Sequence, residues 1–281
     1  MVTDKQLPGI YGLLGRSLEH SLSPSMFAPL LPHLNPISAY VPFPVEPDDL
    51  ARFFAAARFV QVRGINVTVP YKVDALTYCD QKTEECAAVG ATNCIRFSRD
   101  GVIGHNTDVS AFRDSLSSRS IADRRAVVLG SGGAARAVVL ALKELSYQAI
   151  TVVTRDRTRD EAIPLFRGCR LLLWSEELEA AVCDAGLVVN ATPLGMYPQH
   201  HFSPVSMGFR GGQLVYDLVY NPFPTKYLEA ASKAGASTCD GLEMLARQAV
   251  TSLHFWMGAT VAWQKLYASA EKQRQTFSSN K

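Results

Sequence analysis

The feature that most constrains this chain is a glycine-rich turn between an apolar run and a helix-forming run. The segment reads Val127-Val-Leu-Gly130-Ser-Gly132-Gly133-Ala-Ala135 and continues with apolar residues at helical spacing. Glycines let a backbone turn tightly and approach phosphates, and the N-terminus of the next helix offers N–H groups without intrahelical partners. The spacing fits the relaxed dinucleotide-binding fingerprint. Similar turns also occur without a ligand, so the residues that follow decide its meaning.

The next apolar run, Ala149 to Val153, predicts the second strand of a βαβ unit. An NAD enzyme usually has an acid at the end of this strand, where it binds the ribose hydroxyls. This chain has Thr154-Arg155-Asp156 instead. Arginine side chains suit phosphate oxygens, so the 2′-phosphate of NADP is favoured. A solvated basic loop is the alternative interpretation, and Asp156 keeps NAD open.

Apolar strands alternate with helices from residue 125 to residue 240. This alternation predicts an α/β fold with a parallel, doubly wound sheet. Ligands of such sheets bind beyond the carboxyl ends of the strands. We expect five residues near that edge: Gly130, Thr154, Ala191, Thr192 and Leu218.

The 281 residues are 47% hydrophobic and carry a net charge of +2, enough for one large domain or two ordinary ones. Neither nucleic acid nor an anionic membrane is indicated as a partner, and no apolar run is long enough to span a bilayer. The N-terminus lacks the apolar core of a signal peptide. The six cysteines form no metal or CxxC pattern, which favours reduced thiols and a cytoplasmic protein. The histidines predict no metal site.

Two serines stand near the N-terminus, in Ser21-Leu-Ser23-Pro24. Their alternate spacing could point both hydroxyls at a polyol or a carboxylate. Local chemistry favours a simpler interpretation, in which Ser23 caps a helix from Pro24 to about Leu31 and Ser21 has no role.

A predicted strand in the same half alternates apolar and polar residues from Ile65 to Pro70. It should bury Ile65, Val67 and Val69 on one face and present Asn66 and Thr68 on the other. Lys72 follows the strand, where a lysine is usually a solvated charge, but in a cleft could transfer a proton. Asp108 precedes a predicted helix over 109–116, as an N-cap by local sequence or else as a catalytic carboxylate.

The chain ends in two predicted helices that break near Gly258. Gln248 stands one helical turn beyond Met244, on the same face. The polar residues Glu271 to Lys281 are expected to fray.

Together these segments resemble the shikimate dehydrogenase family. The motifs occur in family order from about residue 10 to residue 258, and the most specific are Asn66-Val-Thr68-Val-Pro70-Tyr-Lys72 and Asn106-Thr107-Asp108. The others are Ser21-Leu-Ser23-Pro24, Gly90-Ala-Thr-Asn93, Gly130-Ser-Gly-Gly-Ala134, Asn190-Ala-Thr-Pro-Leu-Gly-Met196, Tyr216-Asp-Leu-Val-Tyr220-Asn-Pro222 and Gly241-x-x-Met244-x-x-x-Gln248.

The resemblance implies NADP-dependent interconversion of 3-dehydroshikimate and shikimate, in aromatic amino acid biosynthesis. It implies that Lys72 and Asp108 are the catalytic pair and also contact substrate. Further substrate-binding residues would be Ser21, Ser23, Thr68, Asn93, Tyr220 and Gln248. Cofactor-binding residues would be Gly130, Ser131, Gly132, Gly133, Ala134, Thr154, Arg155, Arg159, Ala191, Thr192, Leu218, Gly241 and Met244.

The resemblance also implies two domains. A substrate-binding domain would span residues 1–108 and be completed by helices within 242–281, and an NADP-binding Rossmann domain would span 109–241. The chain departs from the family where Thr154-Arg155-Asp156 replaces the usual Asn-Arg-Thr. Quinate or dual quinate/shikimate specificity, with NAD as a further option, therefore stays open. So does a non-catalytic metabolite sensor, and the assembly is expected to be a monomer or a homodimer.

Overall fold

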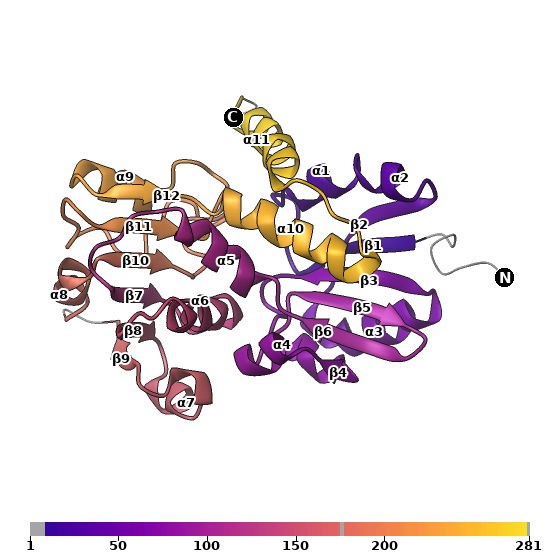
Figure 1. The fold of residues 1–281 in the computed structure, drawn as a ribbon, viewed down its shortest axis with the longest axis horizontal. Helices are drawn as coiled ribbons and strands as arrows, with labels where there is room; N and C mark the ends of the chain where they lie inside the picture. Colours follow the sequence, from indigo (N-terminus) through magenta and orange to yellow (C-terminus); the bar gives the residue numbers. More distant parts are fainter. Residues whose placement is uncertain (1–8, 175–176, 280–281) are drawn as a thin grey trace. The chain divides into compact units, whose positions relative to one another are not determined.

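The computed structural model describes residues 9–174 and 177–279, and the chain divides into two compact units. Unit 1 contains Met1–Thr107 and Leu245–Lys281, and unit 2 contains Asp108–Met244. Each unit has a six-stranded sheet with helices packed on it (Figure 1). The α/β class with two domains, predicted from the sequence, is confirmed.

The sheet of unit 1 is mixed, with strand order β2-β1-β3-β5-β6-β4. Strand β1 pairs in parallel with β2 and β3, whereas β5 is antiparallel to β3 and β6. The edge position of β2 tolerates its prolines, which cannot donate to a ladder. The strands are β1 (Gly9–Gly15), β2 (Ser38–Pro44), β3 (Val62–Val67), β4 (Gln81–Lys82), β5 (Cys94–Ser98) and β6 (Gly101–His105).

Helices cover both faces of this sheet. On one face, Leu50 and Phe54 of α3 pack with Ile65 and Val67 of β3. Helix α10 lies over the opposite face (Figure 1), where Trp256 covers Gly64. The helices are α1 (Ser23–Phe27), α2 (Leu31–Leu34), α3 (Leu50–Phe59), α4 (Glu84–Val89), α10 (Leu242–Met257) and α11 (Trp263–Ser279), with short 3₁₀ turns at Pro47–Asp49 and Asp74–Tyr78.

The face of β3 that was predicted to present Asn66 is covered by α10, so the Asn66 side chain is not presented to solvent. Its amide is buried, donates to Ser252 Oγ at 2.8 Å and accepts from Tyr40 Oη at 3.0 Å. The strand ends at Val67, and Val69, predicted to be buried, is 47% exposed. The local alternation cannot reveal a helix that returns from almost 190 residues later in the chain.

The capping role predicted for Ser23 is also wrong. Helix α1 begins at Ser23, so Ser23 lies inside the helix, and the N-cap residue Leu22 makes no side-chain cap. The Ser23 N–H instead donates to Ser21 Oγ at 3.2 Å, so Ser21 is the residue that holds the turn.

The predicted fraying of the C-terminal tail is wrong as far as Ser279, where α11 ends. Leu266, Ala270 and Arg274 of this helix are buried. Ser269 Oγ donates to the Ser25 carbonyl at 2.8 Å, so α11 is fastened to the start of α1.

The sheet of unit 2 is entirely parallel, with order β12-β11-β10-β7-β8-β9. Numbered within the unit, this is the strand order of the dinucleotide-binding Rossmann fold. Its central strands are continuous apolar runs because both faces are covered. The strands are β7 (Arg125–Leu129), β8 (Ala149–Thr154), β9 (Arg170–Leu173), β10 (Leu187–Asn190), β11 (Leu214–Asp217) and β12 (Ser237–Cys239).

One face of this sheet packs on α8 and α9, through residues such as Val182 and Leu228. On the other face, Phe112 and Ser115 of α5 contact Tyr216 of β11, and α5 packs beside α6 (Figure 1). The helices are α5 (Asp108–Ser117), α6 (Gly133–Glu144), α7 (Arg157–Glu161), α8 (Glu177–Asp184) and α9 (Lys226–Lys233), with a 3₁₀ turn at Pro164–Phe166. Within the described ranges, no helix has the length and apolar character that crossing a membrane requires.

We predict that Gly64→Ala destabilises the protein by about 1–3 kcal/mol, the usual cost of overpacking a core. A Cβ at Gly64 would lie 2.6 Å from the Trp256 ring, and the backbone of a central strand cannot withdraw. Urea unfolding measures the difference. Gly211→Ala is the matched control, because its Cβ would meet no atom closer than 3.8 Å. Equal stability of the two variants would contradict the prediction.

Candidate active site

The carboxyl ends of four parallel strands in unit 2 meet around the glycine turn. The Gly130 N–H donates to the Val153 carbonyl at 2.9 Å, which fastens the turn to the end of β8. The Ala191 N–H donates to the Leu129 carbonyl at 3.0 Å and fastens the next strand end. All five residues expected at this edge, Gly130, Thr154, Ala191, Thr192 and Leu218, lie there.

The turn fits a dinucleotide pyrophosphate. Gly130 has φ +106°, a backbone conformation that favours glycine. A Cβ at this position would also lie only 3.1 Å from Thr192 Cγ2, so a larger residue is disfavoured by both the backbone and the packing. A Cβ at Gly132 would meet nothing within 4 Å, so this side of the turn is open. Helix α6 begins at Gly133, and no described side chain caps it. The first N–H groups of α6 are therefore suited to an anion.

Gly241 and Leu218 come together at the same end of unit 2. A Cβ at Gly241 would overlap the Leu218 carbonyl, so only glycine allows this approach. Met244, also predicted to bind cofactor, lies in the first turn of α10 and is buried.

The residues predicted to bind the 2′-phosphate form one cluster with the glycine turn. Arg159 Nη2 donates to Ser131 Oγ at 3.1 Å, and the Thr154 hydroxyl lies 3.4 Å from the same oxygen. Arg155 is exposed beside them. Asp156 accepts from the Arg159 N–H at 3.0 Å and so caps α7, which gives this acid a local role other than binding ribose.

Two charged residues of this cluster were missed by the sequence reasoning. Asp160 is fully buried and accepts from Thr154 Oγ1 at 2.5 Å and Arg159 Nε at 2.8 Å. Burial raises the pKa of Asp160, but hydrogen bonds from Arg159, Ser131 and Thr154 outweigh it and lower the pKa below its usual value. Arg136, in the first turns of α6, is half-buried, and burial lowers its pKa. In sequence, Asp160 looks no different from the exposed acid Glu161.

In unit 1, the structure connects two predicted substrate-binding residues through a third that was missed. The Asn93 amide donates to Thr107 Oγ1 at 2.9 Å, and its oxygen accepts from the Thr107 N–H at 2.7 Å. Thr107 Oγ1 in turn donates to Gln248 Oε1 at 3.3 Å. All three residues are buried, so the amides are held in one orientation. Thr107 is part of the Asn106-Thr107-Asp108 motif, and this motif was the sequence signal from which its role could have been predicted.

Lys72 is held beside this network through its backbone. Its carbonyl accepts from the Thr92 N–H at 2.7 Å, and the side chain is half-buried. Thr68 stands at the end of β3, where a Cβ on Gly15 would lie 2.6 Å from its methyl group and 2.6 Å from Leu18. Gly15 therefore separates Thr68 from Leu18. The Leu18 carbonyl accepts from the Ser21 N–H, so Leu18 belongs to the turn that leads to Ser21 and Ser23.

The remaining predicted residues of the site, Asp108 and Tyr220, lie in unit 2. Asp108 is the first residue of α5, is buried, and directly follows Thr107 in the chain. Tyr220 follows the end of β11 and is half-buried.

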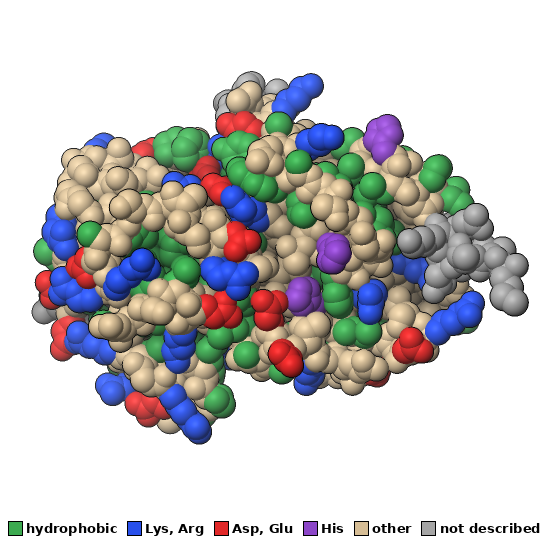
Figure 2. All heavy atoms as spheres, viewed as in Figure 1, with side chains coloured by type: hydrophobic (Ala, Val, Ile, Leu, Met, Phe, Trp, Pro, Cys, Tyr) green, Lys and Arg blue, Asp and Glu red, His purple; other side chains and the backbone are tan. Residues whose placement is uncertain are grey.

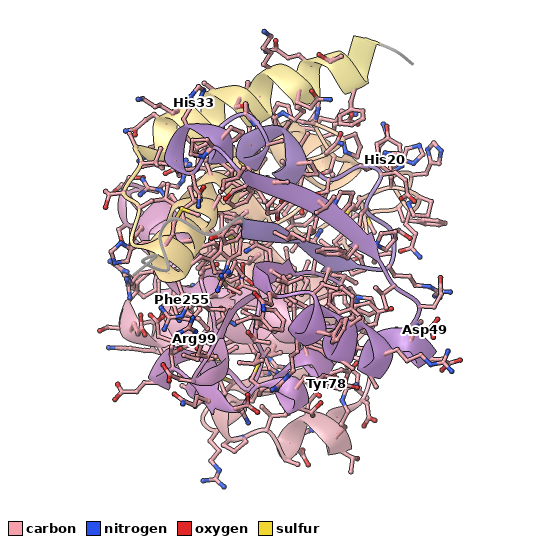
Figure 3. The ribbon with its side chains drawn as sticks, turned by 90° about the vertical axis from the view of Figure 1, so that its right-hand side faces the viewer. His20, His33, Asp49, Tyr78, Arg99 and Phe255 are labelled. Carbon is pink, nitrogen blue, oxygen red and sulfur yellow. The ribbon has the colours of Figure 1, made fainter. Side chains whose placement is uncertain are left out.

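The described residues contain no group of three His, Cys, Asp or Glu that could hold a metal ion. His20 and His33 lie well apart in Figure 3. Basic and acidic side chains are interspersed over the face drawn in Figure 2.

A buried carboxylate also holds the strand ends of unit 2 together. Asp217 accepts from Asn190 Nδ2 at 2.8 Å, from the Val219 N–H at 3.0 Å and from Thr225 Oγ1 at 2.6 Å. These bonds join the turn after β10, which carries Ala191 and Thr192, to the segment after β11. Burial raises the pKa of Asp217 to about 7, although the three hydrogen bonds lower it.

Comparisons with known proteins agree on one family. The family model described as the shikimate dehydrogenase substrate binding domain matches residues 13–95. Shikimate dehydrogenase (NADP(+)) of Gloeothece citriformis is 37% identical over 265 residues, 90% of this chain and 92% of the relative. The crystal structure of shikimate dehydrogenase 1 from Peptoclostridium difficile has a TM-score of 0.83 and 30% identity, and covers 96% of this chain and 99% of that one.

A second similar structure contains ligands. It is shikimate 5-dehydrogenase from Thermus thermophilus in complex with NADP(H) and shikimate, with a TM-score of 0.81 and 30% identity, covering 94% of this chain and 99% of that one. The resemblance inferred from the motifs is confirmed by these matches.

We predict that Asp217 makes the protein less stable as the pH rises from 4 to 7. The folded state keeps the Asp217 proton up to about pH 7, whereas the unfolded chain releases it near the usual value of 3.8. Each unit of pKa corresponds to about 1.4 kcal/mol, so the free energy of unfolding should fall by up to about 4 kcal/mol relative to Asp217→Asn. Urea unfolding at several pH values measures this difference.

Asp100→Asn, at an exposed turn, is the control for this prediction and should follow the wild-type curve. Parallel curves for wild type and Asp217→Asn would show that the pKa of Asp217 is the same in the folded and unfolded states, and would contradict the prediction.

Proposed function

This chain belongs to the shikimate dehydrogenase family, and on that premise we propose that it reversibly reduces 3-dehydroshikimate to shikimate with NADPH. The observation that carries the proposal is that the match to relatives named as NADP-linked shikimate dehydrogenases extends over both units. The reaction class is that of an oxidoreductase acting on an alcohol carbon, in aromatic amino acid biosynthesis.

Lys72 and Asp108 are the proposed catalytic pair. In the reductive direction the carbonyl carbon gains a hydride, which NADPH supplies when bound, and the oxygen gains a proton. The ammonium group of Lys72 stabilises the developing oxyanion and then delivers the proton. Asp108 orients Lys72 and the substrate hydroxyl. In the oxidative direction the same groups act in reverse.

The proposed substrate-binding residues are the polar residues that carry the family motifs. Ser21, Ser23, Thr68 and Asn93 hold the carboxylate and the hydroxyls of the substrate, and Gln248 and Tyr220 close the other side. The hydrogen bonds through Thr107 support the roles of Asn93 and Gln248, because a ligand hydroxyl gains most from groups that are already oriented.

NADP is the proposed cofactor, with the pyrophosphate on the open glycine turn at the start of α6 and the 2′-phosphate on Arg155 and Arg159. Met244, Leu218 and Gly241 complete this side. We assign the substrate-binding role to residues 1–108 and 242–281 and the cofactor-binding role to residues 109–241. The cytoplasmic location and the monomeric or homodimeric state stay predictions.

We expect turnover with shikimate and NADP when initial rates are measured for shikimate and quinate, each with NADP and with NAD. The exposed arginines and the capping role of Asp156 favour the phosphorylated cofactor. Preferred turnover of quinate, or preference for NAD, would contradict this specificity. Cofactor binding without any turnover would favour the sensor.

We predict that Lys72→Ala lowers kcat by about 10²–10⁴-fold, the usual contribution of a positioned proton donor, and changes KM for shikimate far less. Steady-state kinetics measure both constants. Lys82→Ala, which removes an exposed lysine from β4, is the control and should retain wild-type kcat. Near-normal kcat in Lys72→Ala, with substrate binding intact, would remove Lys72 from the mechanism.

A further inference from the structure

We propose that Asp160 is a positioning residue for the recognition of the 2′-phosphate of NADP. Its buried carboxylate holds Arg159, Thr154 and Ser131 in the arrangement that the phosphate requires. This inference rests on the proposed function, because it concerns the same cofactor.

Asp160 gathers side chains from three separate segments of unit 2. Its two oxygens accept from Thr154 Oγ1 at the end of β8 and from Arg159 Nε on α7. Ser131, in the glycine turn, accepts from Arg159 Nη2 at 3.1 Å and also hydrogen-bonds to the carboxylate. One carboxylate therefore connects the strand end, the arginine helix and the phosphate-binding turn.

The arrangement fixes the direction of the Arg159 guanidinium. The Asp160 side chain is 0% exposed, whereas that of Arg159 is 58% exposed. The acid thus lies on the protein side of the pair, and much of the guanidinium faces solvent. With Nε held by Asp160 and Nη2 by Ser131, a flexible side chain is reduced to one orientation. A preoriented fork binds phosphate oxygens with less loss of side-chain entropy.

The carboxylate is charged in this setting. Although burial opposes ionisation, the hydrogen bonds from Arg159, Ser131 and Thr154 keep the pKa of Asp160 below its usual value. An ion pair with a buried member is retained only where its geometry and hydrogen bonds compensate for desolvation. Thr154 supplies one of these bonds, at the position where this chain departs from the Asn-Arg-Thr that the resemblance leads one to expect.

The sign of the effect separates positioning from simple electrostatics. Removing a negative charge next to a phosphate site should by itself strengthen phosphate binding, since like charges repel. If Asp160 instead positions Arg159, its removal should weaken phosphate binding. The two accounts therefore predict opposite changes for the same substitution.

The test compares two probes that differ only in the 2′-phosphate, adenosine 2′,5′-bisphosphate and adenosine 5′-monophosphate. Calorimetry gives the dissociation constant of each for wild type and for Asp160→Asn. We expect the bisphosphate to bind about tenfold or more weakly to Asp160→Asn, the loss typical of one charged hydrogen bond, with the monophosphate unchanged. In kinetics, KM for NADP should rise while kcat and KM for shikimate stay near wild type.

Glu161→Gln is the matched control. Glu161 is the next residue in the chain and carries the same charge, but it is 57% exposed and pairs with Arg157. Its removal should leave bisphosphate binding unchanged or slightly stronger. A similar weakening in both variants would mean that the segment, not the Asp160 carboxylate, is responsible, and would overturn the inference.

Unchanged or tighter bisphosphate binding in Asp160→Asn would also overturn the inference, as would equal weakening of both probes. If Asp160→Asn does not fold, Asp160→Glu is measured instead. It keeps the charge but displaces the carboxylate by one methylene, and it should also weaken bisphosphate binding; wild-type affinity would refute positioning. A wild-type protein that does not distinguish the two probes would reject the proposed NADP specificity itself.

Discussion

When helices cover both faces of a sheet, polar side chains that bind a ligand are placed at the ends of the strands. Both units of this protein have this arrangement. In unit 2, the central strands are mostly apolar, and three of the parallel strands end on a polar residue, at Thr154, Asn190 and Asp217. In unit 1, Thr68 and Lys72 follow the end of β3. At these positions polar side chains can reach a ligand, whereas inside a covered strand each polar group needs a protein partner, as Asn66 has in Ser252 and Tyr40.

Two buried carboxylates show how the strand ends are stabilised in different ways. Asp160 has a guanidinium partner, and its pKa is lowered despite burial. Asp217 accepts three hydrogen bonds from neutral groups, and burial raises its pKa to about 7. Burial opposes ionisation of both carboxyl groups, and only Asp160 has a guanidinium partner that helps its hydrogen bonds to outweigh this effect. The first carboxylate belongs to the cluster proposed to bind phosphate, and the second joins two neighbouring strand ends.

The substrate side depends on contacts between residues that are distant in the chain. Gln248, from α10, is connected to Asn93 through Thr107, and Ser252 of the same helix accepts a hydrogen bond from the buried Asn66 amide. Trp256 fixes how closely α10 approaches, because glycine at position 64 leaves room for the indole ring and no more. The helix therefore stabilises unit 1 and supplies a proposed substrate-binding amide.

The sequence by itself determined the α/β class, the glycine turn, the family and the residues that carry its motifs. These features could be predicted because strand and helix periodicity, glycine spacing and short motifs each depend on residues that are close together in the sequence. The local signals failed where distant segments meet. Ser21 rather than Ser23 holds the first turn, Asn66 is covered by α10, and the tail to Ser279 is helical because α11 packs on α1.

Only the tertiary structure decided which charged and polar residues support the site. Asp160 and Glu161 are adjacent acids beside arginines, yet Asp160 is buried against Thr154 and Arg159, whereas Glu161 is exposed to solvent. Thr107 connects Asn93 with Gln248 because α10 packs beside Asn93 in the folded chain. Burial and hydrogen-bond partners are properties of the folded chain, because they depend on residues that the sequence places far apart.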